Sequence, residues 1–153
     1  AAEAMSDDLN RQMINAAKEG RTVDMKSLVK RGAEVNSANG IGWTALHYAT
    51  AKGHDDCVGS LVNRHANVNA QTRMSKETPL MLAALWGHTS TVQKLLEAGA
   101  DPTLTDQRGM TALDRAKEQN KTECIRRLEN AAAARAQAPT SGMAQLSVTP
   151  APA

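Results

Sequence analysis

Aromatic side chains are nearly absent from this 153-residue chain, which has two Trp, one Tyr and no Phe. A hydrophobic core must therefore be built from Leu, Ile, Val, Met and Ala. Trp43 and Tyr48 both lie in the stretch GWTALHYATAKGH, and the remaining aromatic residue is Trp86. Because so few aromatics are available, the positions that they occupy indicate either a part of the core or a contact surface.

Several other features are scarce, and each scarcity excludes a class of protein. Two cysteines are too few for a disulfide framework, and without an export signal they favour a reducing, cytoplasmic location, with the nucleus as the alternative. The chain has no run of 18 apolar residues, so we expect no membrane partner. A net charge of +2 without a basic stripe predicts no nucleic-acid partner. Residues 1–5 are expected to be an N-terminal scar or fray.

What the chain does contain is a repeat of 33 to 34 residues. Thr44, Thr78 and Thr111 each open a similar stretch, at separations of 34 and 33 residues. One leucine of each unit follows the same period, namely Leu28, Leu61, Leu95 and Leu128. Several independent series with one period make a chance match improbable, and periods of this size indicate a solenoid.

The local signals within one period predict two short helices and a loop. Thr78 and Pro79 are typical of a helix N-cap followed by proline at the first helical position. Gly87 is placed to end that helix in the left-handed conformation, and a second helix follows over TSTVQKLLEA. Neither helix is long enough to be stable alone in water, so the units must stack on one another.

The stretches GWTALHYA, ETPLMLAALWGH and EAGADPT resemble the ankyrin repeat family. The resemblance covers about Leu9 to Asn130 and implies an all-α ankyrin-repeat solenoid of helix–turn–helix units joined by hairpin loops. We predict a domain over 6–130, with units at about 6–36, 37–69, 70–103 and 104–130. The first and last units look like caps. Residues 131–153 are predicted to be an Ala-rich helix extension followed by a disordered Pro/Ser/Thr tail.

Two positions depart from the family pattern. His65 stands where the other units have Gly32 and Gly99, so a histidine is expected to adopt the left-handed conformation at a small cost. The third hairpin, AQTRMSKE, is one residue longer and lacks the turn glycine found at Gly42 and Gly109. We therefore expect its tip to be irregular and more mobile.

The histidines and cysteines are predicted to be structural, with no metal, no cofactor and no catalytic site. His47 lies three residues after Thr44, within reach of its hydroxyl, and no two histidines have the spacing of metal ligands. Cys57 and Cys124 lie two repeats apart and are expected to be buried free thiols. The acidic pairs Asp7–Asp8 and Asp55–Asp56 are each expected to begin a helix, where they favour the positive end of its dipole.

The resemblance implies that a partner binds the concave face, which consists of the hairpin tips and the exposed side of each first helix. The candidate contact residues on this face are Ile41, Trp43, Lys52, Met74, Glu77, Leu85, Trp86, Arg108 and Met110. Large apolar residues gathered at such positions indicate an interaction surface. The alternative for the two tryptophans is packing against neighbouring hairpins. Tyr48 takes a signature position and is expected to lie in the core or between repeats.

The sequence thus predicts a non-catalytic protein–protein interaction module that acts as an adaptor, scaffold or inhibitor. Its partner would be another protein or peptide, and the chain is expected to be a monomer, with tail-mediated self-association as the alternative. Two other hypotheses stay open. One is a regulatory or targeting domain of a larger protein, itself enzymatic or not. The other is an enzyme or nucleotide-binding domain with a site that no motif reveals.

Overall fold

The computed structural model describes residues 2–137, and the regular structure within this span is helical apart from an isolated bridge between Ala38 and Thr44. The helices are α1 (Ala2–Lys18), α2 (Thr22–Lys30), α3 (Ala45–Lys52), α4 (Asp55–Asn63), α5 (Pro79–Trp86), α6 (Thr89–Glu97), α7 (Ala112–Glu118) and α8 (Thr122–Gln137). The predicted all-α solenoid of helix–turn–helix units is therefore confirmed. None of these helices combines the length and the apolar character needed to cross a bilayer.

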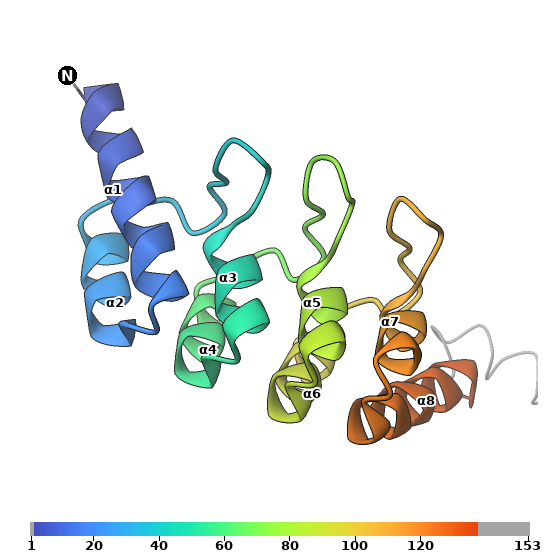
Figure 1. Cartoon of the computed structure of the whole chain (residues 1–153). Coiled ribbons are helices and arrows are strands. Elements are labelled where there is room, and N and C mark those ends of the chain that lie inside the picture. Colours follow the sequence, from blue (N-terminus) through green and yellow to red (C-terminus); the bar gives the residue numbers. More distant parts are fainter. Residues whose placement is uncertain (1, 138–153) are drawn as a thin grey trace, which may run out of the picture.

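The helices form two parallel rows. The first helices of the units, α1, α3, α5 and α7, each pack on the next, and the second helices, α2, α4, α6 and α8, do the same behind them. A hairpin loop precedes α3, α5 and α7, and all three hairpins extend in the same direction from the inner row (Figure 1). The inner row and its hairpins therefore share one face of the solenoid.

The predicted signals set the helix boundaries. The hydroxyl of each signature threonine accepts a hydrogen bond from the backbone N–H three residues on, at Thr44, Thr78 and Thr111. Gly53 and Gly87 end their helices with positive φ angles of 72° and 74°. His65 has a φ of 66°, which confirms that a histidine takes the left-handed position there.

The core lies between the two rows and is aliphatic, as the lack of aromatics requires. Its largest fully buried apolar side chains are Met13, Met25, Leu46, Leu61, Leu80, Met81, Leu95, Leu128, Val58 and Val92. These residues come from every unit, so each helix pair buries its apolar face against its neighbours. Such contacts explain why helices of seven to nine residues are stable here.

The two ends differ from expectation in part. Helix α1 begins at Ala2, so residues 2–5, expected to be a fray, have helical backbone, and Asp7 and Asp8 lie inside the helix instead of at its start. Ala and Glu have high helix propensity, which favours extension of the helix over a cap at the acidic pair. At the other end α8 continues through the Ala-rich stretch to Gln137. The predicted disordered tail lies outside the described residues.

The hairpin of the third unit, which precedes α5, has one extra residue but keeps the hydrogen bond that closes it. The backbone N–H of Thr72 donates to the carbonyl of Glu77 at 3.0 Å, as Asn39 does to Trp43 at 2.9 Å in the preceding unit. Lys76 occupies the place of the missing turn glycine and has a φ of 58°. A lysine therefore adopts the left-handed conformation at this turn. The expected mobility of the tip stays a prediction.

Successive hairpins are joined through their backbones, and this brings Gly42 close to the next unit. The N–H of Arg73 donates to the carbonyl of Ile41 at 3.1 Å. A Cβ atom on Gly42 would lie 2.5 Å from the backbone nitrogen of Arg73, whereas one on Gly109 would meet nothing within 4 Å. Both glycines have positive φ, at 84° and 77°.

We therefore expect Gly42→Ala to lower the free energy of unfolding by about 2 kcal/mol, since it adds a backbone clash to the left-handed strain. The matched variant Gly109→Ala bears only the strain and should lose about 1 kcal/mol. Urea denaturation followed by circular dichroism measures both values. Equal losses in the two variants would show that the approach of Arg73 to Gly42 is unimportant for stability.

Candidate functional site

A groove on the concave face lies between α3 and α5 and collects all three aromatic residues. We call it the aromatic groove, and it is lined by Lys18, Trp43, Tyr48, Ala51, Lys52, Trp86 and His88. Three of the predicted contact residues, Trp43, Lys52 and Trp86, are thus brought together from two adjacent units. Trp86 is 58% exposed, although it is one of the largest apolar side chains in the chain.

Local sequence places each aromatic residue. Trp43 directly precedes the N-cap Thr44, so it stands at the base of a hairpin, and Trp86 is the last residue of α5 before Gly87. Tyr48 lies on the exposed side of α3, and its ring centroid is 4.8 Å from that of Trp43. Trp43 is half-buried by this contact and by His47, at 5.9 Å. Trp43 therefore packs within its own unit and also lines the groove.

Tyr48 joins two units, as predicted, and also contributes to the groove. It is half-buried against the core, and its hydroxyl accepts a hydrogen bond from the Asn39 side chain at 2.9 Å. The Nζ atom of Lys18, from the first unit, lies 5.4 Å from the centroid of the Tyr48 ring, within cation–π range. The groove thus has aromatic walls with a positive charge at one side.

The other predicted contact residues lie on the same face but outside the aromatic groove. Ile41 and Met74 stand at hairpin tips and are 57% and 78% exposed. Leu85 and Met110 are half-buried. Arg108 is exposed, with a nitrogen 3.5 Å from a carboxylate oxygen of Glu118.

Glu77 is held in an ion pair within the chain. Its carboxylate lies 2.6 Å from the guanidinium of Arg115, and both side chains are largely buried. Arg115 also pairs with the buried carboxylate of Asp106 at 2.9 Å. The position before the signature threonine was expected to face a partner, but in this unit the carboxylate turns toward α7 because a guanidinium is available there. Glu77 therefore joins the third unit to the fourth.

The histidines have the predicted structural roles. Nδ1 of His47 lies 2.9 Å from the Thr44 hydroxyl, and its Nε2 lies 3.0 Å from the carbonyls of both Ala70 and Glu77. His54 and His88 each contact a carbonyl of the preceding unit through Nε2. In the described part of the chain, no three His, Cys, Asp or Glu side chains gather as a metal site would require.

The two cysteines are free and buried, as predicted. The Cys57 sulfur lies 3.1 Å from the Thr22 hydroxyl, and the Cys124 sulfur lies 3.6 Å from the Thr89 hydroxyl, so the same contact recurs two units apart. Burial raises the pKa of the Cys57 thiol above its usual value. A buried thiol with a raised pKa is a poor nucleophile, which fits a packing role.

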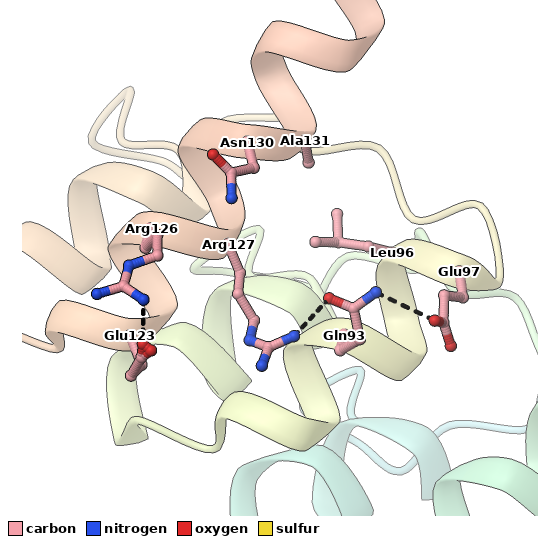
Figure 2. Close-up of a pocket in the computed structure, with 8 residues that line it drawn as sticks. All are labelled: Gln93, Leu96, Glu97, Glu123, Arg126, Arg127, Asn130 and Ala131. Atoms are coloured by element: carbon pink, nitrogen blue, oxygen red, sulfur yellow. Dashed lines mark hydrogen bonds and ion pairs between the residues drawn. The ribbon is translucent and has the colours of Figure 1, made fainter.

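A second hollow lies on the opposite side, between α6 and α8, and we call it the outer pocket. Its lining residues are Gln93, Leu96, Glu97, Glu123, Arg126, Arg127, Asn130 and Ala131. Figure 2 shows that several of its polar side chains bond to one another: Arg127 donates to Gln93 at 2.9 Å, and Gln93 donates to Glu97 at 3.1 Å. Arg126 pairs with Glu123 at 3.3 Å. These side chains have partners within the pocket, unlike the exposed Trp86.

Sequence reasoning did not include Lys18, Tyr48 or His88 among the contact residues. Lys18 stands two residues before Gly20, the position that Ala51 and Leu85 occupy before their own glycines. The register therefore contained the signal for Lys18, but the first unit was interpreted as a cap and its residues were not counted among the contacts. His88 and Tyr48 were predicted to have structural roles only. Both make structural hydrogen bonds, and both also line the groove.

Comparison with known proteins agrees with this architecture. The family model described as ankyrin repeats (3 copies) matches residues 13–106 and 64–138. The chain is 37% identical over 100 residues to human ankyrin repeat and SOCS box protein 3, covering 64% of this chain and 19% of that protein. It is 31% identical over 121 residues to the E3 ubiquitin-protein ligase hecd-1 of Caenorhabditis elegans, covering 78% and 4%.

A third relative is protein HOS4 of Saccharomyces cerevisiae, which is 33% identical over 124 residues, with 78% of this chain and 11% of that protein covered. The chain thus spans less than a fifth of the length of each of these three relatives. The matched family model covers most of the described residues. The chain therefore belongs to the ankyrin repeat family, whose repeats are protein–protein interaction modules.

Proposed function

We propose that this chain is a non-catalytic recognition module that binds a partner protein through the aromatic groove. The observation that carries the proposal is the exposed Trp86 beside Trp43 and Tyr48 of the preceding unit. Ile41 and Met74 extend the apolar surface to the hairpin tips. The module would act as an adaptor, scaffold or inhibitor, as a monomer, in the cytoplasm or the nucleus.

The energetic argument favours Trp86 as the main anchor. A Trp side chain that is largely exposed in the free protein can gain a large buried area on binding, and tryptophan is among the residues most enriched at interface hot spots. Trp43 is already half-buried by Tyr48 and His47, so it gains less. Replacing Trp86 should therefore change the binding affinity with little effect on the stability of the fold.

We expect Trp86→Ala to weaken binding of the natural partner about thirtyfold, the effect of a hot spot of about 2 kcal/mol. Partners would be isolated from source cells with the wild-type chain and identified, and their affinities measured by calorimetry with purified proteins. The melting temperature of Trp86→Ala should stay close to that of the wild type, because the side chain is exposed.

Two control variants test other surfaces. Val23 on α2 is 79% exposed, so Val23→Ala removes an exposed apolar side chain outside the aromatic groove. Arg126→Ala alters the outer pocket (Figure 2). Both variants should keep wild-type affinity. A partner that is lost with Arg126→Ala and kept with Trp86→Ala would place recognition on the outer pocket instead.

The alternative proposal is that the chain is the regulatory or targeting domain of a longer protein. The small share of each relative that the chain covers favours it, since those proteins include an E3 ubiquitin-protein ligase and a SOCS box protein. Mass spectrometry of the native protein in its source cells tests this alternative. A native mass close to the 16.3 kDa of this chain would contradict it.

A further inference from the structure

The aromatic groove contains two lysines and no carboxylate. Lys18 comes from α1 and Lys52 from α3, and both side chains are exposed. Among the ion pairs of residues 2–137, neither lysine takes part. Two positive charges therefore stand beside an exposed apolar surface with no negative group of the same groove to compensate them.

The other half of the concave face has a different charge pattern. Arg108 is paired with Glu118, and Arg115 is held between Glu77 and Asp106. These arginines already have carboxylate partners, so they offer little uncompensated charge to a ligand. Lys18 and Lys52 thus lie toward the first two units, on the same side as Trp43 and Tyr48.

The groove continues toward the N-terminal unit. A neighbouring pocket between α1 and the hairpin that precedes α3 shares Lys18 and Tyr48 with the aromatic groove. Its further lining includes the amide of Asn15 and the carboxylate of Asp7, while Arg11 in the same pocket lies 3.6 Å from Asp8. Asp7 lies 11 residues before Lys18 on α1, which is about 16 Å along the helix. An extended ligand could therefore cross Lys18 and Tyr48 and continue over α1.

Charge and shape exclude several occupants. A cationic ligand is disfavoured because Lys18 already lies over the Tyr48 ring and Lys52 lies nearby. The segment 139–153 of this chain contains apolar residues but no Asp or Glu, so its side chains bring no negative charge to the two lysines. A single strand of nucleic acid could stack on tryptophans, but two lysines give it a small electrostatic footprint.

We infer that the aromatic groove takes an acidic linear peptide segment of the partner, with an apolar anchor residue against Trp43 and Trp86 and carboxylates beside Lys18 and Lys52. This inference rests on the proposed function and names the chemistry of the partner. Complementary charges of this kind fix the register of a peptide and raise its association rate, while the apolar anchor supplies most of the affinity.

A random peptide library displayed on phage and selected on the full chain tests the inference. We expect the enriched peptides to share an aromatic or large aliphatic residue flanked by Asp or Glu. Synthetic copies would be measured by fluorescence polarisation. Replacing their acidic residues with Asn or Gln should weaken binding about tenfold, and added salt should weaken the acidic form more than the neutral form.

A charge exchange tests the positions of the lysines. Lys18→Glu/Lys52→Glu should reduce affinity for the acidic peptide at least tenfold, and a peptide with Lys in place of its acids should then bind the variant better than it binds the wild type. Both lysines are exposed, so circular dichroism should show an unchanged fold. Lys94→Glu/Lys26→Glu, two exposed lysines of the outer row, is the matched control and should leave affinity unchanged.

The remaining outcomes separate the two proposals. Binding that is lost with Trp86→Ala but is indifferent to acids overturns the inference and keeps the proposed groove. Binding of selected peptides that survives Trp86→Ala overturns the proposed groove itself. Failure to enrich peptides, tighter binding of oligothymidylate or of a synthetic peptide of residues 139–153, or concentration-dependent dimers that block the groove would each overturn the inference.

Discussion

Replacing Arg115 with leucine is expected to lower the free energy of unfolding by about 3 kcal/mol, near the lower end of the cost of breaking a buried ion pair. The Nε atom of Arg115 donates to Asp106 at 2.9 Å, and an Nη atom donates to Glu77 at 2.6 Å. The side chain of Asp106 is only 1% exposed, so without Arg115 its charge would stay buried and uncompensated. Urea denaturation followed by circular dichroism measures the loss.

The same variant should become less sensitive to acid. Burial tends to raise the pKa of Asp106, but the N–H groups of Met110 and Arg108 and the guanidinium of Arg115 outweigh it and hold the pKa below its ordinary value. A lowered pKa in the folded state means that the carboxylate stabilises the fold above about pH 4 and that this contribution is lost as the pH falls further. Without Arg115 the pKa of Asp106 rises, so the folded and unfolded chains differ less in proton binding, and the stability difference between the wild type and the variant should shrink on acidification.

The chain itself supplies a matched control for this pair. In the second unit Asn39 and Tyr48 occupy the places of Asp106 and Arg115, and their side chains share a neutral hydrogen bond of 2.9 Å. The double variant Asp106→Asn/Arg115→Tyr should therefore recover the part of the lost stability that comes from the buried charge of Asp106, while Glu77 stays without its guanidinium partner. If Arg115→Leu alone unfolds at the wild-type denaturant concentration, the buried pair contributes nothing to stability.

This pair also illustrates which contacts could be predicted from the sequence. The period places Arg115 at the position of Tyr48 and Leu82, four residues after the signature threonine. It could not reveal that the guanidinium would reach Glu77 of the preceding unit, because that contact depends on how closely α5 and α7 approach. The period places a residue within its unit, whereas the partner of a long polar side chain is selected by the stacked neighbour.

The aromatic groove was predictable to a greater extent. Trp43 precedes a signature threonine and Trp86 precedes a helix-closing glycine, so the register alone placed both on the concave face. Apolar side chains at such positions require no specific partner, which makes their location easier to infer. Lys18 was not predicted because the first unit was interpreted as a cap, although Gly20 gave a usable reference position.

His47 carries the second large expected effect, since it joins the second unit to the third. The side chain is fully buried, and its Nε2 lies between the carbonyls of Ala70 and Glu77. Two acceptors at Nε2 require that this nitrogen bears the proton, so Nδ1 accepts from the backbone N–H of Thr44 at 3.1 Å. The ring therefore completes a helix cap on one side and binds the next unit on the other.

We expect His47→Met to lower the free energy of unfolding by about 3 kcal/mol, because two carbonyls lose their donor and Thr44 loses its acceptor. Methionine is the residue that the third unit has at this position, Met81, where the Thr78 N–H points at its sulfur. His47→Gln keeps an N–H donor of similar reach and should lose only about 1 kcal/mol. Denaturation by urea at neutral pH compares the three proteins.

The pH dependence separates hydrogen bonding from titration. Burial lowers the pKa of His47, and its bonds to the carbonyls of Glu77 and Ala70 offset this only in part. The unfolded chain therefore binds a proton that the folded chain rejects, so the stability of the wild type should fall as the pH drops below about 6.5. Neither variant can titrate at this position. The stability difference between the wild type and each variant should consequently shrink on acidification. A difference that stays constant from neutral to mildly acidic pH would show that His47 is protonated as readily in the folded chain as in the unfolded chain.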